Sequence, residues 1–87
     1  MTNAVLIHIG FGNMLNRDKV IAIVNPNSAP VRRNISECEA NNKLVNATGG
    51  RKAKSAIVAS GRFIILSALS PETIQGRVKV QKEENGH

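Results

Sequence analysis

Aromatic side chains are almost missing from this sequence of 87 residues, which contains no Trp, no Tyr and only Phe11 and Phe63. Proteins that hold single-stranded DNA or RNA usually stack the bases on aromatic rings. Duplex DNA can be gripped through its phosphates without any aromatic contact. The scarcity of aromatics therefore favours a duplex over a single strand if the partner is a nucleic acid.

Cysteine and long apolar runs are also scarce. Cys38 is the only cysteine, which excludes an internal disulfide and a cysteine-based zinc site. No apolar run approaches the roughly 20 residues needed to cross a bilayer, and the first residues lack the basic and apolar blocks of a signal peptide. We expect a cytoplasmic protein that does not bind a membrane.

The combinations of side chains that support catalysis are missing as well. His8 lies in an apolar run and His87 is the last residue, while Asp18 is the only aspartate. Glu37 and Glu39 are two residues apart on a predicted helix, so their side chains diverge. No paired carboxylates, metal cluster or nucleophile–base pair can be assembled. We predict a protein that is not an enzyme and that uses no cofactor, metal or small-molecule substrate.

Positive charge is abundant. Twelve Lys and Arg residues face six acidic residues, for a formal net charge of +6. Two of the acids, Glu83 and Glu84, lie in the polar C-terminal segment, so the rest of the chain is more basic still. A small basic body attracts polyanions, and nucleic acid is the commonest of these in the cytoplasm.

The apolar pattern predicts an α+β domain with the element order ββαβββα and a mostly antiparallel sheet. Short apolar runs bounded by Gly, Pro and Asn predict strands, and these cover residues 4–9, 19–24, 43–47, 55–59 and 63–69. Ser28 is expected to cap a helix that runs to about Asn42 and turns Val31, Ile35 and Cys38 to one side. Ser70 and Pro71 begin a short second helix.

We expect residues 1–80 to form one domain and residues 81–87 a flexible polar tail. The strands carry more apolar surface than two short helices can cover in a domain of this size. We therefore predict that the protein forms a homo-oligomer.

The segment ATGGRKAKSAI, residues 47–57, places Arg51, Lys52 and Lys54 after two glycines. On the helix, Glu37 is expected to pair with Arg33, and Glu39 with Lys43, at the spacing of one helical turn. No acid in the local sequence neutralises the three cations after the glycines. Unpaired cations on a glycine-hinged turn suit contact with phosphate oxygens.

Four segments of the sequence, in order, resemble the RemA family of bacterial extracellular-matrix regulators. They are IGFGNML, NPNSAPVRR, LVNATGGRKAK and ILSALSPETI. The similarity runs from about residue 5 to residue 79, and its signature includes Gly10, Gly12 and the glycine and arginine of residues 47–51.

The resemblance implies a transcriptional activator of matrix and biofilm genes that binds double-stranded DNA at the nucleoid. It also implies a subunit fold like that of the LytTR domain, and a ring-shaped heptamer or octamer around which DNA bends. The family's DNA-contacting arginines match Lys19, Arg51 and Lys52. Because two of these positions are lysine, charge is kept but the planar, two-point grip of arginine is absent there.

Two hypotheses remain. In the first, an oligomeric regulator binds duplex DNA through basic turns, and specificity arises from how readily the DNA bends. Its candidate DNA-binding residues are Arg51, Lys52, Lys19 and Arg17, with Lys54, Arg32 and Arg33 as weaker candidates. In the second, the protein is a structural or adaptor ring whose basic face binds RNA or an acidic protein.

Overall fold

The computed structural model describes the backbone of residues 5–85 and the side chains of residues 5–79. It confirms a small α+β domain, with one strand more than the sequence predicts. The elements are β1 (Leu6–Gly10), β2 (Asn13–Asn16), the 3-10 turn η1 (Arg17–Lys19), β3 (Val20–Val24), α1 (Ala29–Ala40), β4 (Leu44–Ala47), β5 (Ser55–Ala59), β6 (Phe63–Ser67) and α2 (Pro71–Asn85).

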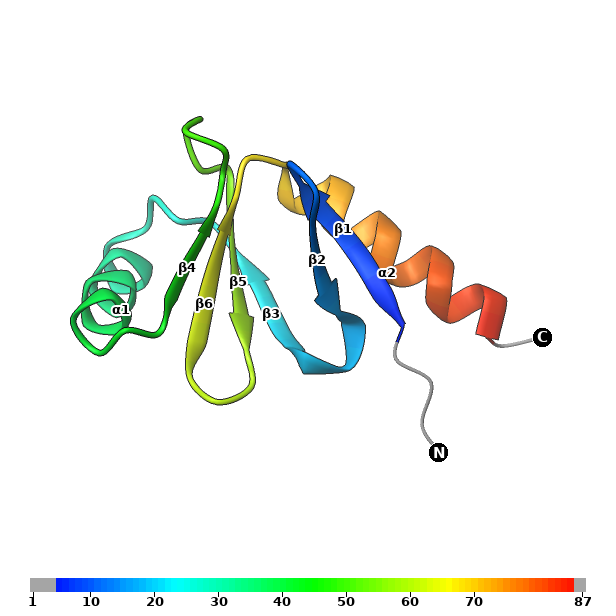
Figure 1. Ribbon diagram of the computed structural model, residues 1–87, viewed down its shortest axis with the longest axis horizontal. Helices are drawn as coiled ribbons and strands as arrows, with labels where there is room; N and C mark the ends of the chain where they lie inside the picture. The colour runs from blue at the N-terminus through cyan, green and yellow to red at the C-terminus, as the bar shows by residue number, and fades with distance from the viewer. Residues whose placement is uncertain (1–4, 86–87) are drawn as a thin grey trace.

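The strands form two sheets. β1 and β2 make an antiparallel hairpin, and the other four strands form a sheet in the order β3-β5-β6-β4. Neighbours in this sheet are antiparallel except β4 and β6, which run parallel to each other. Figure 1 shows α1 beside β4 at one end of the molecule and α2 beside β1 at the other.

The strand absent from our prediction is β2, which completes the β1–β2 hairpin. Gly10, Phe11 and Gly12 turn the chain with φ angles of +107°, +53° and +77°. The Asn13 amide Nδ2 donates to the Gly10 carbonyl at 3.0 Å and closes the turn. β2 has the sequence NMLN, without a β-branched residue, so its composition gave no strand signal.

The two helices differ in how well the sequence predicted them. Val31, Ile35 and Cys38 of α1 are half-buried, as their spacing predicted. Ser28 is the N-cap residue of α1 as predicted, but its hydroxyl makes no capping hydrogen bond to the helix and donates to the Asn25 carbonyl at 3.5 Å instead. Ser70 does cap α2, because its Oγ accepts from the Thr73 amide at 3.2 Å.

The second helix is not short, because α2 runs for 15 residues to Asn85. Residues 86 and 87 lie outside the described part, and the flexible tail of residues 81–87 stays a prediction.

The core lies between the hairpin, α2 and one face of the four-stranded sheet. Buried isoleucines dominate it: Ile7 and Ile9 from β1, Ile57 and Ile65 from the sheet, and Ile74 from α2. On the opposite face of the sheet, Val58 and Ile64 face α1 across an open groove. The core therefore fixes the hairpin over the sheet at the end where the glycine-rich loops lie.

Candidate nucleic-acid interface

The loop of residues 48–54, between β4 and β5, carries Arg51, Lys52 and Lys54. The Arg51 amide donates to the Thr48 carbonyl at 3.1 Å, which closes a four-residue turn around Gly49 and Gly50. Both glycines have positive φ, +62° and +84°, the pattern of a type I′ turn that side-chain-bearing residues rarely adopt. The two glycines are thus required by the turn that presents the cations.

Hydrogen bonds fix both ends of this loop. The Thr48 amide and hydroxyl both donate to Asn46 Oδ1, at 3.0 and 2.6 Å. At the other end, the Lys54 amide donates to the Ser67 carbonyl at 2.8 Å. The cations therefore stand on a loop whose ends are fixed and whose centre is a glycine turn.

Two buried serines hold the strands beneath this loop. Ser67 Oγ donates to the Ile9 carbonyl at 2.7 Å, and Ser55 Oγ donates to the Leu69 carbonyl at 2.6 Å. The first bond joins β6 to the end of β1, just before the Gly10–Gly12 turn. Both serines lie in strands that the sequence predicted, but nothing in their spacing indicated that they would hydrogen-bond to distant carbonyls and hold these strands together.

Phe11, at the tip of the hairpin, meets the loop of residues 48–54. A Cβ on Gly49 would lie 2.6 Å from the Cδ1 of Phe11, so the ring packs directly on the glycine backbone. The Arg51 guanidinium lies over the same ring, 5.5 Å from Cζ to the ring centre. Two segments almost 40 residues apart in the sequence thus meet at Arg51, an arrangement that the sequence reasoning missed.

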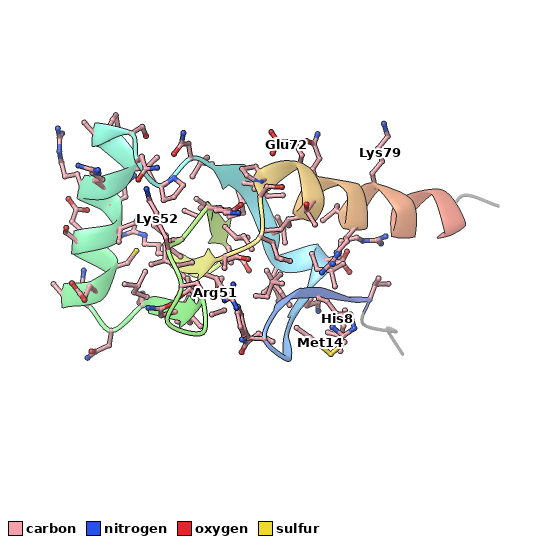
Figure 2. The ribbon with its side chains drawn as sticks, turned by 90° about the horizontal axis from the view of Figure 1, so that it is seen from above. His8, Met14, Arg51, Lys52, Glu72 and Lys79 are labelled. Carbon is pink, nitrogen blue, oxygen red and sulfur yellow. The ribbon has the colours of Figure 1, made fainter. Side chains whose placement is uncertain are left out.

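The three loop cations are exposed and differ in direction. Figure 2 shows Arg51 turned toward the hairpin and Lys52 extending toward α1. Within residues 5–79, the one ion pair joins Arg17 to Asp18, so none of the three is neutralised there. The positive charge of the loop is therefore available to an external anion.

The structure does not bring Lys19 to this loop. The Lys19 carbonyl accepts from the Ser60 amide at 2.9 Å, which places Lys19 beside the β5–β6 connection. Lys54 precedes β5 and Ser60 follows it, so the two basic positions lie at opposite ends of that strand. At about 3.3 Å per residue, they are separated by roughly 20 Å.

Arg17 is less available than the sequence suggests. Its side chain is 19% exposed, and its Nε lies 3.8 Å from Asp18 Oδ1. Its Nη1 is buried without a hydrogen-bond partner in the described structure. Arg17 stands near Lys19 in the chain, but most of its side chain is turned away from solvent.

The remaining candidates, Arg32 and Arg33, are exposed on α1 and belong to a different element from the loop. The pairs expected on this helix, Arg33 with Glu37 and Glu39 with Lys43, are wrong: no ion pair joins them in the described structure. Lys43 instead donates to the Gly61 carbonyl at 3.1 Å and lies over the Phe63 ring at 4.5 Å.

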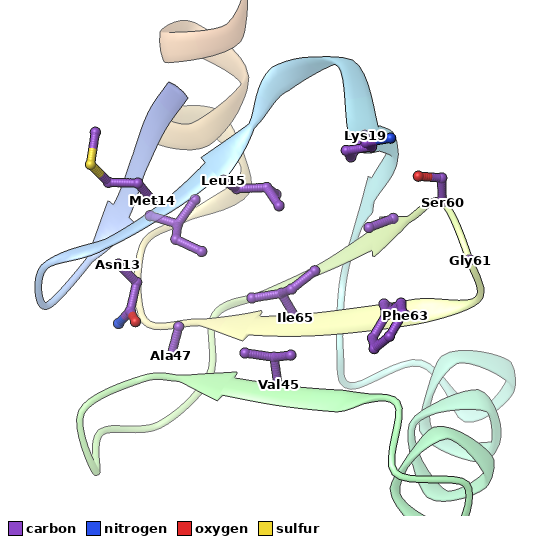
Figure 3. Close-up of a pocket in the computed structure, with 12 residues that line it drawn as sticks. Asn13, Met14, Leu15, Lys19, Val45, Ala47, Ser60, Gly61, Phe63 and Ile65 are labelled. Carbon is purple, nitrogen blue, oxygen red and sulfur yellow. The ribbon is translucent and has the colours of Figure 1, made fainter. Parts of the chain in front are cut away.

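An open groove of about 570 Å³ crosses the core-facing side of the four-stranded sheet, beside β2. Figure 3 shows Asn13 at one end, Lys19 and Ser60 at the other, and apolar side chains between them. Met14, Val45 and Phe63 along this groove are exposed despite their size. Such a groove presents apolar surface and a single cation, with no pair of titratable groups.

Within residues 5–79, the structure gives little evidence for a metal site, a reactive cysteine or a catalytic histidine. No cluster of three or more His, Cys, Asp or Glu side chains that could hold a metal occurs there. The Cys38 thiol is half-buried and donates to the Arg62 carbonyl at 3.4 Å. His8 is exposed on β1 rather than enclosed in the core. Neither helix of the described chain is long and apolar enough to cross a membrane.

A model of RemA-like proteins, described as extracellular matrix regulatory protein A-like, matches residues 6–78. This chain belongs to the RemA-like family. The match includes both glycine-rich turns and the whole four-stranded sheet.

Relatives in several bacteria agree with this membership, and their names describe them only as regulatory proteins. A relative in Synechococcus elongatus is 49% identical over 73 residues, covering 84% of each chain. One in Pseudothermotoga lettingae is 49% identical over 83 residues, covering 92% of this chain and 91% of the relative. One in Brevibacillus brevis is 44% identical over 80 residues, covering 92% of this chain and 93% of the relative. These names point to a regulatory role.

Proposed function

We propose that this protein is a transcriptional regulator that binds double-stranded DNA as a homo-oligomer. The observation that carries the proposal is the loop of residues 48–54, where Arg51, Lys52 and Lys54 are exposed on an anchored glycine turn. When such cations neutralise phosphates, the counterions condensed on the DNA are released, which favours binding. The RemA-like family supports the assignment of regulation, and the resemblance implies that the regulated genes are those of the extracellular matrix and biofilm.

A duplex is favoured over a single strand because both phenylalanines are engaged. Arg51 lies over Phe11, and Lys43 lies over Phe63. Since the sequence has no other Phe and no Tyr or Trp, successive unpaired bases would have only these two rings to stack on. Contact with the phosphates of a duplex needs no aromatic ring.

Self-association is supported by the apolar side chains left exposed in the single subunit. Met14, Val45 and Phe63 line the groove, and Ile21 of β3 is 67% exposed. An assembly would cover such surface, and the family resemblance suggests a ring of LytTR-like subunits. A ring would also repeat the weak basic contact many times, so that neighbours bind at high effective concentration.

The roughly 20 Å between Lys19 and the loop cations fits a subunit that contacts DNA at two places. One subunit would then contact separate phosphates with Lys19 and with the loop of residues 48–54. Alternatively, Lys19 of one subunit and the loop of its neighbour would lie together on the DNA. In both arrangements Lys19 and Arg51 contact phosphates independently, so substituting one of them leaves the phosphate contact of the other intact.

The proposal is tested by replacing Arg51 and Lys52 together with alanine. We expect weaker binding to duplexes of any sequence, because phosphate contacts carry little sequence information. We also expect a shallower dependence of log affinity on log salt, by about 0.9 for each phosphate that the protein no longer neutralises. Fluorescence anisotropy with a labelled duplex, titrated at several salt concentrations, measures both quantities.

The matched control is R32A/R33A, which removes the same charge from α1. A smaller decrease in affinity for this variant would assign DNA binding to the loop. Equal decreases in the two double variants would show that total charge alone governs binding, which contradicts a role for the loop. RNA duplex or polyglutamate competing as well as DNA would favour an adaptor that binds RNA or acidic protein instead.

A further inference from the structure

Phe11 is an exposed aromatic residue in a strained position, and the DNA-binding proposal gives it no contact with DNA. It lies between Gly10 and Gly12 at the tip of the β1–β2 hairpin, with φ of +53° and 55% of its surface exposed. A bulky apolar residue rarely adopts positive φ, and an exposed one contributes little to a core. Its place therefore needs an explanation other than packing of the interior.

The Phe11 ring is in contact with the basic loop. The closest ring atoms, Cδ1, Cγ and Cδ2, would lie 2.6, 2.7 and 2.9 Å from a Cβ on Gly49. Cβ atoms do not occur at such distances, so only glycine at position 49 permits this approach. The neighbouring Gly50 has nothing within 4 Å of the equivalent position.

The Arg51 guanidinium lies over this ring at 5.5 Å, within the range of cation–π attraction. The turn that carries the ring is itself fixed, because Ser67 Oγ donates to the Ile9 carbonyl and Asn13 Nδ2 to the Gly10 carbonyl. A ring carried by a hydrogen-bonded turn thus lies against the glycine turn of residues 49 and 50, where the backbone has the greatest conformational freedom.

We propose that Phe11 is a positioning residue that holds Arg51 in the direction from which it meets a phosphate. A glycine turn loses conformational freedom when it binds, and so does an arginine side chain. The ring removes part of this cost beforehand, because it orders the loop and the guanidinium in the free protein. The contact between the ring and Arg51 exists in the free protein. The effect of this contact on DNA affinity rests on the proposed function.

The contribution of the Phe11 ring to duplex binding through Arg51 is tested by a double-mutant cycle with Phe11→Leu and Arg51→Ala. Leucine keeps an apolar side chain with the same backbone strain but has no aromatic face. At an exposed site the cation–π interaction corresponds to about a two- to fivefold change in affinity for each docked subunit. We expect F11L to weaken duplex binding by this factor in the presence of Arg51, and by less in the R51A background, where only the ordering of the loop is lost.

Two further variants separate positioning from other roles. F11Y keeps the aromatic face and is expected to bind as the unaltered protein does. K43A removes the other cation that lies over a ring, that of Phe63, and is expected to leave the Arg51 contribution unchanged. If F11L weakens binding equally with and without Arg51, the ring touches DNA or supports the fold directly, and the proposal is overturned.

A measurement without DNA distinguishes failure of this inference from failure of the proposed function. Nuclear magnetic resonance should show Arg51 side-chain protons shifted upfield by the ring, with the shift abolished in F11L and kept in F11Y. No such shift in the unaltered protein overturns the inference, whatever the DNA result. A clear shift in a protein that does not bind duplex DNA supports the positioning role of the ring and refutes the proposed function alone.

Discussion

Gly49 and Gly50 are neighbours with different structural roles. Both have positive φ, so each relieves backbone strain that a side-chain-bearing residue would bring. Only Gly49 also faces the Phe11 ring, whereas the Cβ position of Gly50 points into open space. The sequence presents two equivalent glycines, and their difference arises from a hairpin tip almost 40 residues earlier in the chain.

At the residue scale, we predict that Gly49→Ala is more damaging than Gly50→Ala. Each substitution adds roughly 1–2 kcal/mol of left-handed backbone strain, but only G49A also forces the Phe11 ring to move. We therefore expect a larger decrease in unfolding free energy and in duplex affinity for G49A. Urea unfolding and fluorescence anisotropy measure the two effects. Equal behaviour of the variants would show that the ring contact adds nothing to the turn.

At the scale of the element, α2 joins the hairpin to the sheet. Ser70 caps its first turn, and the Ile74 side chain is fully enclosed in the core. One turn later, the Arg77 Nη1 donates to the His8 carbonyl at 2.7 Å and ties the helix to β1. Because β1 carries the Phe11 turn, α2 indirectly fixes the position of the candidate interface.

We predict that Ile74→Ala lowers the free energy of unfolding by about 2–5 kcal/mol, since it leaves a cavity among Ile7, Ile57 and Ile65. The adjacent, exposed Gln75 is the control, and Q75A should change stability by less than about 0.5 kcal/mol. Urea unfolding must be run at one protein concentration, because self-association stabilises the folded state. A small decrease for I74A would mean that α2 docks only weakly on the sheet.

At the scale of the whole molecule, the described chain is elongated, with extents of 40 × 25 × 23 Å. Its candidate DNA-binding cations outside α1 divide between the loop at one end of the sheet and Lys19 at the other. Several of its exposed apolar side chains lie along the groove between β2 and β4. A subunit of this kind binds a polyanion weakly by itself and gains most from association with further copies.

We predict that the protein in solution has a mass several times its 9.3 kDa subunit, as measured by light scattering at micromolar concentration. Val45→Asp should lower this mass, because it places a charge on the exposed side of β4 in the groove. The control N46D adds the same charge on the opposite face and keeps the oxygen that Thr48 binds. A monomeric unaltered protein would refute the multivalent mechanism even if it retained some affinity for DNA.

Much of the fold could be predicted from local pattern. The α+β class, the places of five strands and both helices, and the Ser70 cap follow from apolar runs and their boundaries. β2 could not be found this way, because its four residues form a strand only by pairing with β1. Similarly, the cations of the loop were visible in the sequence, but Phe11 beneath Arg51 and the separation of Lys19 were not.

The sequence by itself determined the basic charge, the scarcity of aromatics, the glycine turn and the family, because these depend on composition and on residues close together in the chain. Only the tertiary structure decided which cations lie at the same end of the sheet, which of the two glycines contacts the Phe11 ring and which apolar side chains stay exposed. These depend on contacts between distant segments, fixed by buried isoleucines and by serine hydrogen bonds. Such contacts arise from packing of the whole chain, so no local pattern encodes them.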